Sequence, residues 1–208
     1  MKNNKNWLHL AVVVCFAILL ASCGNKGSKT VDDTPKRMEI LFLGHKNNTN
    51  HNSIKLAEIL SREYFRSGIN ISFTDNPDDL NKENLDHYAG LIVYANHDTI
   101  TNSQAEALLN YVKGGKGLIA LHSASFCFRN NDDVVEMIGG QFKSHKYDTI
   151  QNVIVKPGHE VMKGITDFKT LDETYVHDKL SPHIEVLGER VEGDHREPYT
   201  WVRPYGEG

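Results

Sequence analysis

A short apolar run, preceded by glycines and followed by a histidine, is the feature that most constrains how this chain folds. Residues 118–121 are Leu-Ile-Ala-Leu, and glycines at 114, 115 and 117 lead into them. An unbroken apolar run of this length is typical of a strand buried on both faces of a parallel sheet. A polar residue at the carboxyl end of a central parallel strand lies where open α/β sheets bind ligands. The sequence therefore predicts a central strand with a functional residue, His122, at its end.

Strand and helix patterns alternate at short intervals between residues 38 and 140. The predicted strands are 38–43, 69–73, 88–94 and 118–121, and helices are predicted from about 52, over 101–113 and over 132–138. Thr101 or Asn102 is expected to cap the second of these helices. Such alternation indicates βαβ units and hence an α/β fold with a mainly parallel sheet.

The pattern changes after residue 140. Residues 149–156, 185–191 and 199–203 are predicted to be strands, but loops dominate, among them 157–160, 170–177 and 193–198. The last predicted strand leads into Tyr205-Gly-Glu-Gly208, after which a hairpin partner would be expected. We therefore expect a loop-rich C-terminal part whose end is incomplete.

The N-terminus has the pattern of an export signal. Lys2 and Lys5 precede an apolar stretch over 8–20, which is shorter than the roughly 20 residues of a membrane-spanning helix. Residues 20–23, Leu-Ala-Ser-Cys, resemble the lipobox of bacterial lipoproteins, and this resemblance implies a lipid anchor on Cys23. An ordinary cleaved signal with a chance cysteine is the alternative. We expect a signal peptide (1–22), a flexible tether (23–37) and one domain (38–208), exported through the inner membrane and anchored in the cell envelope, facing the periplasm or the cell surface.

Charge and cysteine content exclude several classes of function. The formal net charge is −4 and the sequence shows no Lys/Arg stripe, so nucleic acid is not an expected partner. Cys127 is the only cysteine beyond residue 23, so that part of the chain holds neither an internal disulfide nor a cysteine metal cluster. Histidine is abundant, with 11 residues, many of them at predicted strand ends or in loops.

Three histidines follow predicted parallel strands. His45, His97 and His122 each come at or just after the carboxyl end of a strand, and these ends share one edge of the sheet. His122 is expected to act as a general acid or base near neutral pH, or as a metal ligand; a hydrogen-bonded strand-end histidine without chemistry is the alternative. His45 is the better of the other two candidates, because its loop is rich in asparagine and also contains His51.

Several separate stretches resemble, in order, the ThuA-like (trehalose utilisation) family. They are Gly114-Gly-Lys-Gly-Leu-Ile-Ala-Leu-His122, Gly139-Gly-Gln-Phe-Lys-Ser-His145, Pro157-Gly-His159 with Gly164-Ile165, Leu171-Asp-Glu173-Thr-Tyr175 and Pro198-Tyr-Thr-Trp-Val-Arg-Pro-Tyr-Gly206. The resemblance covers about residues 38–208. It implies a flavodoxin-like three-layer fold of the class I glutamine amidotransferase-like superfamily, and a role in the use of trehalose-type or 3-keto glycosides.

The resemblance also directs attention to further residues. His145 and the acidic motif Asp172-Glu173 with Tyr175 match family motifs, so His145, Asp172 and Tyr175 are expected to bind substrate along with His45 and His97, and Glu173 to act with His122 in catalysis. The amidotransferases of the superfamily place a nucleophilic cysteine after the central strand, where this chain has His122 and Ser123. Thiol-dependent glutamine hydrolysis is therefore not expected.

These residues favour an enzyme of carbohydrate utilisation acting on a small glycoside at the cell envelope. Two alternatives remain open at this stage. One is a non-catalytic sugar-binding lipoprotein. The other is a metal-dependent hydrolase or lyase, in which His45, His122 and His145 are the candidate ligands and Zn²⁺ the leading metal.

Overall fold

The computed structural model describes residues 36–46 and 51–208, and residues 36–208 form one compact unit. The predicted signal peptide and the tether as far as residue 35 lie outside the described residues. Within the described ranges, no helix combines the length and the apolar character needed to cross a membrane.

The first part of this unit, residues 38–140, is a parallel α/β layer structure. Its strands are β1 (Met38–Leu43), β2 (Ile69–Thr74), β3 (Gly90–Val93) and β4 (Gly117–Ala120), and its α-helices are α2 (Ser53–Tyr64), α3 (Lys82–Leu85), α4 (Asn102–Lys113) and α5 (Asp132–Ile138). The strands pair in the order β2-β1-β3-β4, and all three pairings are parallel. The α/β class with a mainly parallel sheet is thus confirmed.

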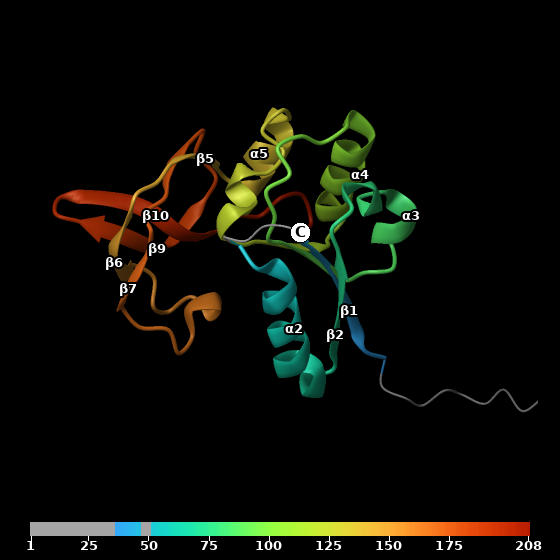
Figure 1. Ribbon diagram of the computed structural model, residues 1–208, viewed down its shortest axis with the longest axis horizontal. Coiled ribbons are helices and arrows are strands. Elements are labelled where there is room, and N and C mark those ends of the chain that lie inside the picture. The colour runs from blue at the N-terminus through green and yellow to red at the C-terminus, as the bar shows by residue number, and fades with distance from the viewer. Residues whose placement is uncertain (1–35, 47–50) are drawn as a thin grey trace, which may run out of the picture. The chain divides into compact units, whose positions relative to one another are not determined.

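Apolar side chains bury both faces of the two inner strands. Leu41 and Leu91 face one side and pack in a core with α4 and α5, whereas Phe42 and Ile92 face the other side and pack with Ala57 of α2. This division follows from the period-2 alternation of side chains along a strand. Figure 1 shows the result, with α2 below the sheet and α3, α4 and α5 above it.

Strand β4 differs from its prediction. It lies at the edge of the sheet, and its residues 117, 119 and 120 are exposed, Ile119 to 55%. The expectation of a central strand buried on both faces is therefore wrong for the described chain. The physical reason is that an apolar run specifies a strand, whereas its position in the sheet depends on pairings that the local sequence does not encode.

Local signals explain where the helices begin and end. Asn52 caps α2 by accepting a hydrogen bond from the Lys55 backbone N–H (2.9 Å), and Thr101 forms a capping box with Gln104 at the start of α4. Gly139 ends α5 with a φ of 103°, and a Cβ there would lie 2.5 Å from Nε1 of Trp201. Glycine at 139 is required both by its backbone conformation and by this close approach.

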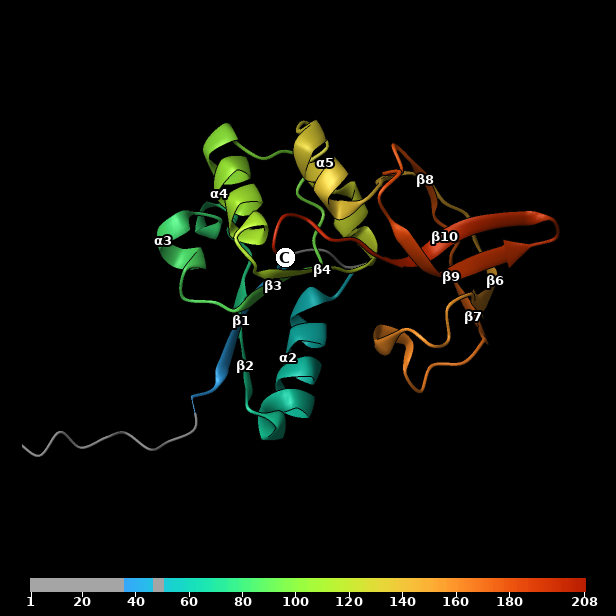
Figure 2. The same cartoon turned by 180° about the vertical axis from the view of Figure 1, so that it is seen from behind.

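The second part, residues 141–202, is antiparallel. It contains β5 (Gln141–Ser144), β6 (Tyr147–Ile154), β7 (Phe168–Glu173), β8 (Val176–Asp178), β9 (Glu185–Glu192) and β10 (His195–Val202). One sheet has the order β10-β9-β6-β7 (Figure 2), and a second sheet pairs β5 with β8. The expected loop at 170–177 is therefore wrong, because it holds most of β7 and part of β8, and this part of the chain is richer in strands than predicted.

The four-stranded antiparallel sheet has a group of buried polar residues on one face, and its other face exposes Tyr147 and Leu171. On the buried face lie Ile150 (0% exposed) and three polar side chains, Asn152 (2%), Arg190 (2%) and Glu197 (5%). Buried polar groups at alternate positions weaken the apolar alternation that identifies a half-buried strand. This mixture is one reason why the sequence pattern indicates fewer strands in this part than the structure contains.

Candidate active site

His122 occupies a strained position directly after β4. Its φ is +48°, in the left-handed region that residues other than glycine seldom adopt, and it begins a 3-10 turn over His122–Phe126. The backbone N–H of Leu121 donates to the Val93 carbonyl (2.9 Å), so pairing with β3 continues to the residue before the turn. Strain of this kind persists only where the surroundings hold it, and it concentrates at functional sites.

Glu173, at the end of β7, connects two histidines. Its Oε2 lies 3.2 Å from Nε2 of His122, and its Oε1 lies 3.8 Å from Nε2 of His145. Its own backbone N–H donates to Oδ1 of Asp172 (2.8 Å). Residues that are 51 positions apart in the chain, His122 and Glu173, are thus brought within contact distance by the antiparallel part.

His51 is the residue that sequence reasoning missed. One ligand atom each from His51, His122 and Glu173 all lie within 4.8 Å of one another, and the His51 ring meets the His122 ring edge-on with centroids 4.8 Å apart. His51 precedes Asn52, the N-cap of α2, and the helix after β1 begins at the carboxyl edge of the sheet. The position of His51 directly before this helix could have indicated it as a site residue, because helices that begin at this edge of the sheet start beside the ligand crevice.

His45 and His97, for which substrate binding stays a prediction, contact each other. Their rings stack with centroids 4.3 Å apart; the Asn96 N–H donates to Nδ1 of His45 (3.1 Å), and Nε2 of His97 lies 3.2 Å from the Gly44 carbonyl oxygen. Burial is the main cause that lowers the pKa of His97, and the neighbouring His45 adds to it. Among the described residues, the converging ligand group contains His51 and not His45.

Two tyrosine rings lie beside the group formed by His51, His122, His145 and Glu173, here named the His–Glu cluster. The Tyr175 ring lies 4.6 Å from that of His122 and 5.8 Å from that of His145, and the Tyr94 ring lies 5.8 Å from that of His51. Burial raises the pKa of Tyr175, and the neighbouring Glu173 carboxylate raises it further. Both phenols are therefore neutral near pH 7, since burial also raises the pKa of Tyr94.

The surroundings of His122 favour its neutral form, because they lower its pKa. Burial is the largest cause that lowers its pKa, followed by the nearby His51, whereas Glu173 and Asp172 act in the opposite direction. A neutral imidazole offers a nitrogen lone pair that can accept a proton or bind a metal ion. The carboxylate beside it would stabilise the charged form once a proton is taken.

Ser123 lies in the 3-10 turn that begins at His122, and Cys127 directly follows this turn. Burial raises the pKa of the Cys127 thiol to about 12, and its Sγ donates to the Ala95 carbonyl (2.9 Å). A thiol in this state is not a nucleophile at neutral pH. The Ser123 side chain is 0% exposed, and its Oγ has no hydrogen-bond partner among the described residues.

Two residues of the family-like stretches, His159 and Trp201, have structural contacts. His159 accepts a hydrogen bond from the Val161 backbone N–H (3.2 Å) and caps the short turn Glu160–Met162. Trp201 donates from Nε1 to the Ile138 carbonyl (3.0 Å), and its ring meets that of His177 edge-on. Both contacts account for these side chains without a ligand.

Two hollows lie away from the His–Glu cluster. One of about 840 Å³ runs along α2 and β2, and one of about 780 Å³ lies between α3 and α4. Neither is lined by a residue of the cluster. Since reactive sites are identified by convergent titratable groups as well as by volume, the cluster is the better candidate site.

The parallel strand order β2-β1-β3-β4 and the helices on both faces of the sheet define a flavodoxin-like α/β protein. A family model named ThuA, described as trehalose utilisation, matches residues 39–208, so the chain belongs to the ThuA family. This membership relates the protein to trehalose utilisation. A comparison with curated protein sequences finds no match.

Two solved structures share the fold. A ThuA-like protein from Bacteroides uniformis ATCC 8492 has 16% identity and a TM-score of 0.70, over 83% of this chain and 80% of its own. A ThuA-like protein from Parabacteroides merdae ATCC 43184 has 15% identity and a TM-score of 0.64, over 83% of this chain and 77% of its own. At this level of identity, the similarity establishes the fold.

Proposed function

We propose that this protein is an enzyme that acts on a small glycoside, of the trehalose type or its 3-keto form, with His122 as general acid/base and Glu173 as its partner. The observation that supports this most is the position of the Glu173 carboxylate between the imidazoles of His122 and His145. His145 and the buried Tyr175 would hold the sugar beside this pair, and Asp172 would support Glu173 through its hydrogen bond to the Glu173 N–H.

The chemistry that the pair can perform is proton transfer near neutral pH. With a trehalose-type glycoside, a neutral His122 would take a proton from a water molecule while the water oxygen bonds to the anomeric carbon. With a 3-keto glycoside, it would take the proton of C2, next to the keto group, and the released electron pair would form a C1=C2 double bond. In both cases the glycosidic C–O bond breaks, Glu173 stabilises the imidazolium, and His122 returns the proton to the leaving oxygen. A 3-keto glycoside suits this arrangement, because its carbonyl acidifies the neighbouring C–H.

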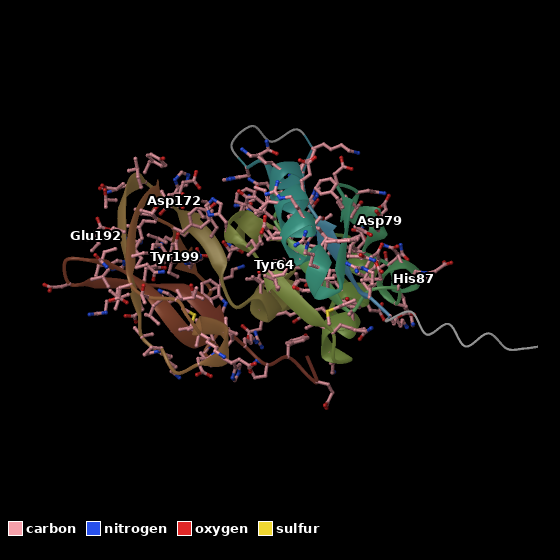
Figure 3. All side chains as sticks on the ribbon, turned by 90° about the horizontal axis from the view of Figure 1, so that it is seen from below. Tyr64, Asp79, His87, Asp172, Glu192 and Tyr199 are labelled. Atoms are coloured by element: carbon pink, nitrogen blue, oxygen red, sulfur yellow. The ribbon has the colours of Figure 1, made fainter. Side chains whose placement is uncertain are left out.

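The test is turnover of trehalose, other disaccharides and their 3-keto forms by a His122→Asn variant. Asparagine tolerates a positive φ better than alanine, so this variant keeps the backbone of the turn. We expect the rate with any active substrate to fall about 10²–10⁴-fold. The matched control is His87→Asn, an exposed histidine before β3 (Figure 3), which should keep its rate. An unchanged rate in the His122→Asn variant would remove His122 from the mechanism.

A second candidate function is metal-dependent hydrolysis or elimination, favoured by the convergence of His51, His122 and Glu173. Two imidazoles and one carboxylate form a donor set that suits Zn²⁺, and three protein ligands leave a position open for water or substrate. His145, 3.8 Å from Glu173, is the nearest further imidazole. A bound metal would polarise a sugar carbonyl or activate water.

Metal analysis of protein purified without chelators decides between these two mechanisms. If the site binds metal, about one Zn²⁺ per chain should be found, and it should be lost in His51→Ala and Glu173→Gln but retained in His45→Ala. Metal-free protein that still turns over a glycoside would support acid/base catalysis alone. Tight sugar binding without turnover, measured by calorimetry, would instead support a binding lipoprotein.

We also propose, from the lipobox resemblance at residues 20–23, that the protein is anchored in the cell envelope through Cys23. Incorporation of a radiolabelled fatty acid tests this. The label should be present in the native chain and absent from Cys23→Ser, and equal labelling of both would refute the anchor.

A further inference from the structure

The exposed face of β6 and β7 continues directly from the candidate site. Tyr147 pairs with Glu173 and Thr149 pairs with Leu171 in the antiparallel register. Directly opposed residues point to the same face of a sheet, and so do residues two apart on one strand. Tyr147, Leu171 and Glu173 therefore share one face, and β7 is the edge strand of its sheet.

This face presents two large apolar side chains to solvent beside a candidate catalytic carboxylate. Tyr147 is 67% exposed and Leu171 is 59% exposed, whereas Ile150 on the opposite face is fully buried. The opposite face is therefore covered at Ile150, whereas Tyr147 and Leu171 are left largely uncovered by the described chain. Opposed Cβ atoms are about 5 Å apart, so Tyr147 begins immediately beside Glu173.

We propose that Tyr147 and Leu171 form a subsite for the second ring of a two-ring glycoside whose first ring lies against His122 and Glu173. The inference rests on the proposed function, since it takes the His–Glu cluster as the place of the first ring. The C–H face of a pyranose is apolar and packs on an aromatic ring, while its hydroxyl groups need polar partners. Thr149, Gln151 and Lys169 supply such partners, because the register places them on the same face as Tyr147.

The substrate class that follows is a disaccharide or a glycoside with a ring-shaped aglycone. A single sugar would fill only the part of the site at Glu173 and leave the Tyr147–Leu171 face in water. Continuity of this face with the site favours a substrate over a protein partner, since one ligand can touch both Glu173 and Tyr147.

The test measures binding, so it does not depend on turnover. The full-length chain carries Cys23→Ser to prevent lipidation and His122→Asn to prevent reaction, and is titrated with trehalose and with methyl glucoside by calorimetry or NMR. We expect the two-ring sugar to bind at least about tenfold more tightly than the one-ring sugar. Adding Tyr147→Ala or Leu171→Ser should bring the ratio of the two affinities toward one, whereas Tyr147→Phe should keep it.

The control is Tyr64→Ala, an aromatic residue 48% exposed at the end of α2, which should leave the ratio unchanged (Figure 3). The inference is overturned if neither sugar binds, if both bind equally, or if Tyr147→Ala keeps the preference. Turnover by the chain with His122 intact is measured separately. Preference for two rings without turnover of any glycoside would refute the proposed catalysis and support the subsite.

Discussion

The parallel and antiparallel parts of this protein bury their strands differently, and each contributes half of the candidate site. The inner strands of the parallel sheet are apolar on both faces, as at Leu41 and Phe42. The antiparallel sheet buries Arg190 and Glu197 on one face and exposes Tyr147 on the other. Continuous apolar runs are easy to recognise as strands, whereas a face that contains charged residues is not.

The two parts also differ in how well the sequence predicts the residues that each brings to the candidate site. The parallel part supplies His51 and His122 at the carboxyl edge of its sheet, where the general rule for α/β proteins places ligands. The antiparallel part supplies His145, Glu173 and Tyr175, and no comparable positional rule identifies them. The candidate site thus depends on contacts between a part of the molecule that the sequence predicts well and a part that it predicts less well.

The largest expected effect tests whether the two parts form one catalytic unit. His122→Asn in the parallel part and Glu173→Gln in the antiparallel part should each reduce kcat/KM about 10²–10⁴-fold. In the proposed mechanism both groups serve one proton transfer, so the double variant should be no slower than the slower single variant. Steady-state kinetics with the best glycoside substrate would show this. Additive losses would mean that the two residues act independently.

The next largest effect is the loss of stability when a buried leucine is truncated in the parallel part or in the antiparallel part. Leu91→Ala on β3 should lower the free energy of unfolding by about 3–5 kcal/mol, because Leu91 packs in the large core beneath α4 and α5. Leu187→Ala on β9 removes a side chain that is equally buried but belongs to neither core cluster of the parallel part, and should cost about 2–3 kcal/mol. Urea unfolding measures both values. A larger loss for Leu187 would place the stability of the protein in its antiparallel part.

A smaller effect concerns the buried polar face. Glu197 accepts the His177 backbone N–H (2.8 Å) and lies 3.2 Å from ring nitrogens of both His177 and His195. Glu197→Ala should destabilise the fold by about 1–3 kcal/mol, because a buried N–H loses its acceptor. His195→Ala is the control; since this side chain is 53% exposed, its loss should change stability by less than about 0.5 kcal/mol. If the Glu197→Ala variant were as stable as the unsubstituted chain, the predicted loss would be wrong, and the buried face would tolerate the change.

The smallest effect is the pH dependence of stability, to which both parts should contribute. Burial lowers the pKa of His97 in the parallel part and of His177 in the antiparallel part below the ordinary value of 6.5. Below that value the unfolded chain binds protons that the folded chain excludes, so stability should be complete above about pH 6.5 and fall on acidification. His177 faces Glu197, Arg190 and Asp178, and His97 faces His45 and Asp75.

Urea unfolding at several values between pH 5 and 7.5 measures this slope. Replacing His97 or His177 by glutamine should flatten it relative to an exposed-histidine control, His87→Gln. Stability that rises as the pH falls would contradict the inferred neutral state of these histidines.

Much of the parallel part could be predicted because its signals are local. Residues 38–43 were expected to form a strand and do so, and Thr101 caps α4 by the mechanism expected of a threonine there. The arrangement of the candidate site was harder to predict from the sequence. The sequence indicates His122 by its place after a strand and Glu173 by a family motif, and whether they catalyse a reaction stays a prediction. In the first loop it favours His45 over His51, whereas His51 is the histidine that lies beside His122.

The sequence by itself determined that this chain has alternating strands and helices, where its main helices begin, and that it belongs to a family marked by ordered motifs. Only the tertiary structure decided that β4 lies at an edge, that Glu173 meets His122, and that His51 is the histidine that joins them. Helix caps and apolar runs depend on residues that are neighbours in the sequence, so they can be recognised from the sequence alone. The convergence of imidazoles and a carboxylate depends on strand order, register and the path of loops, which arise from contacts between residues far apart in the chain.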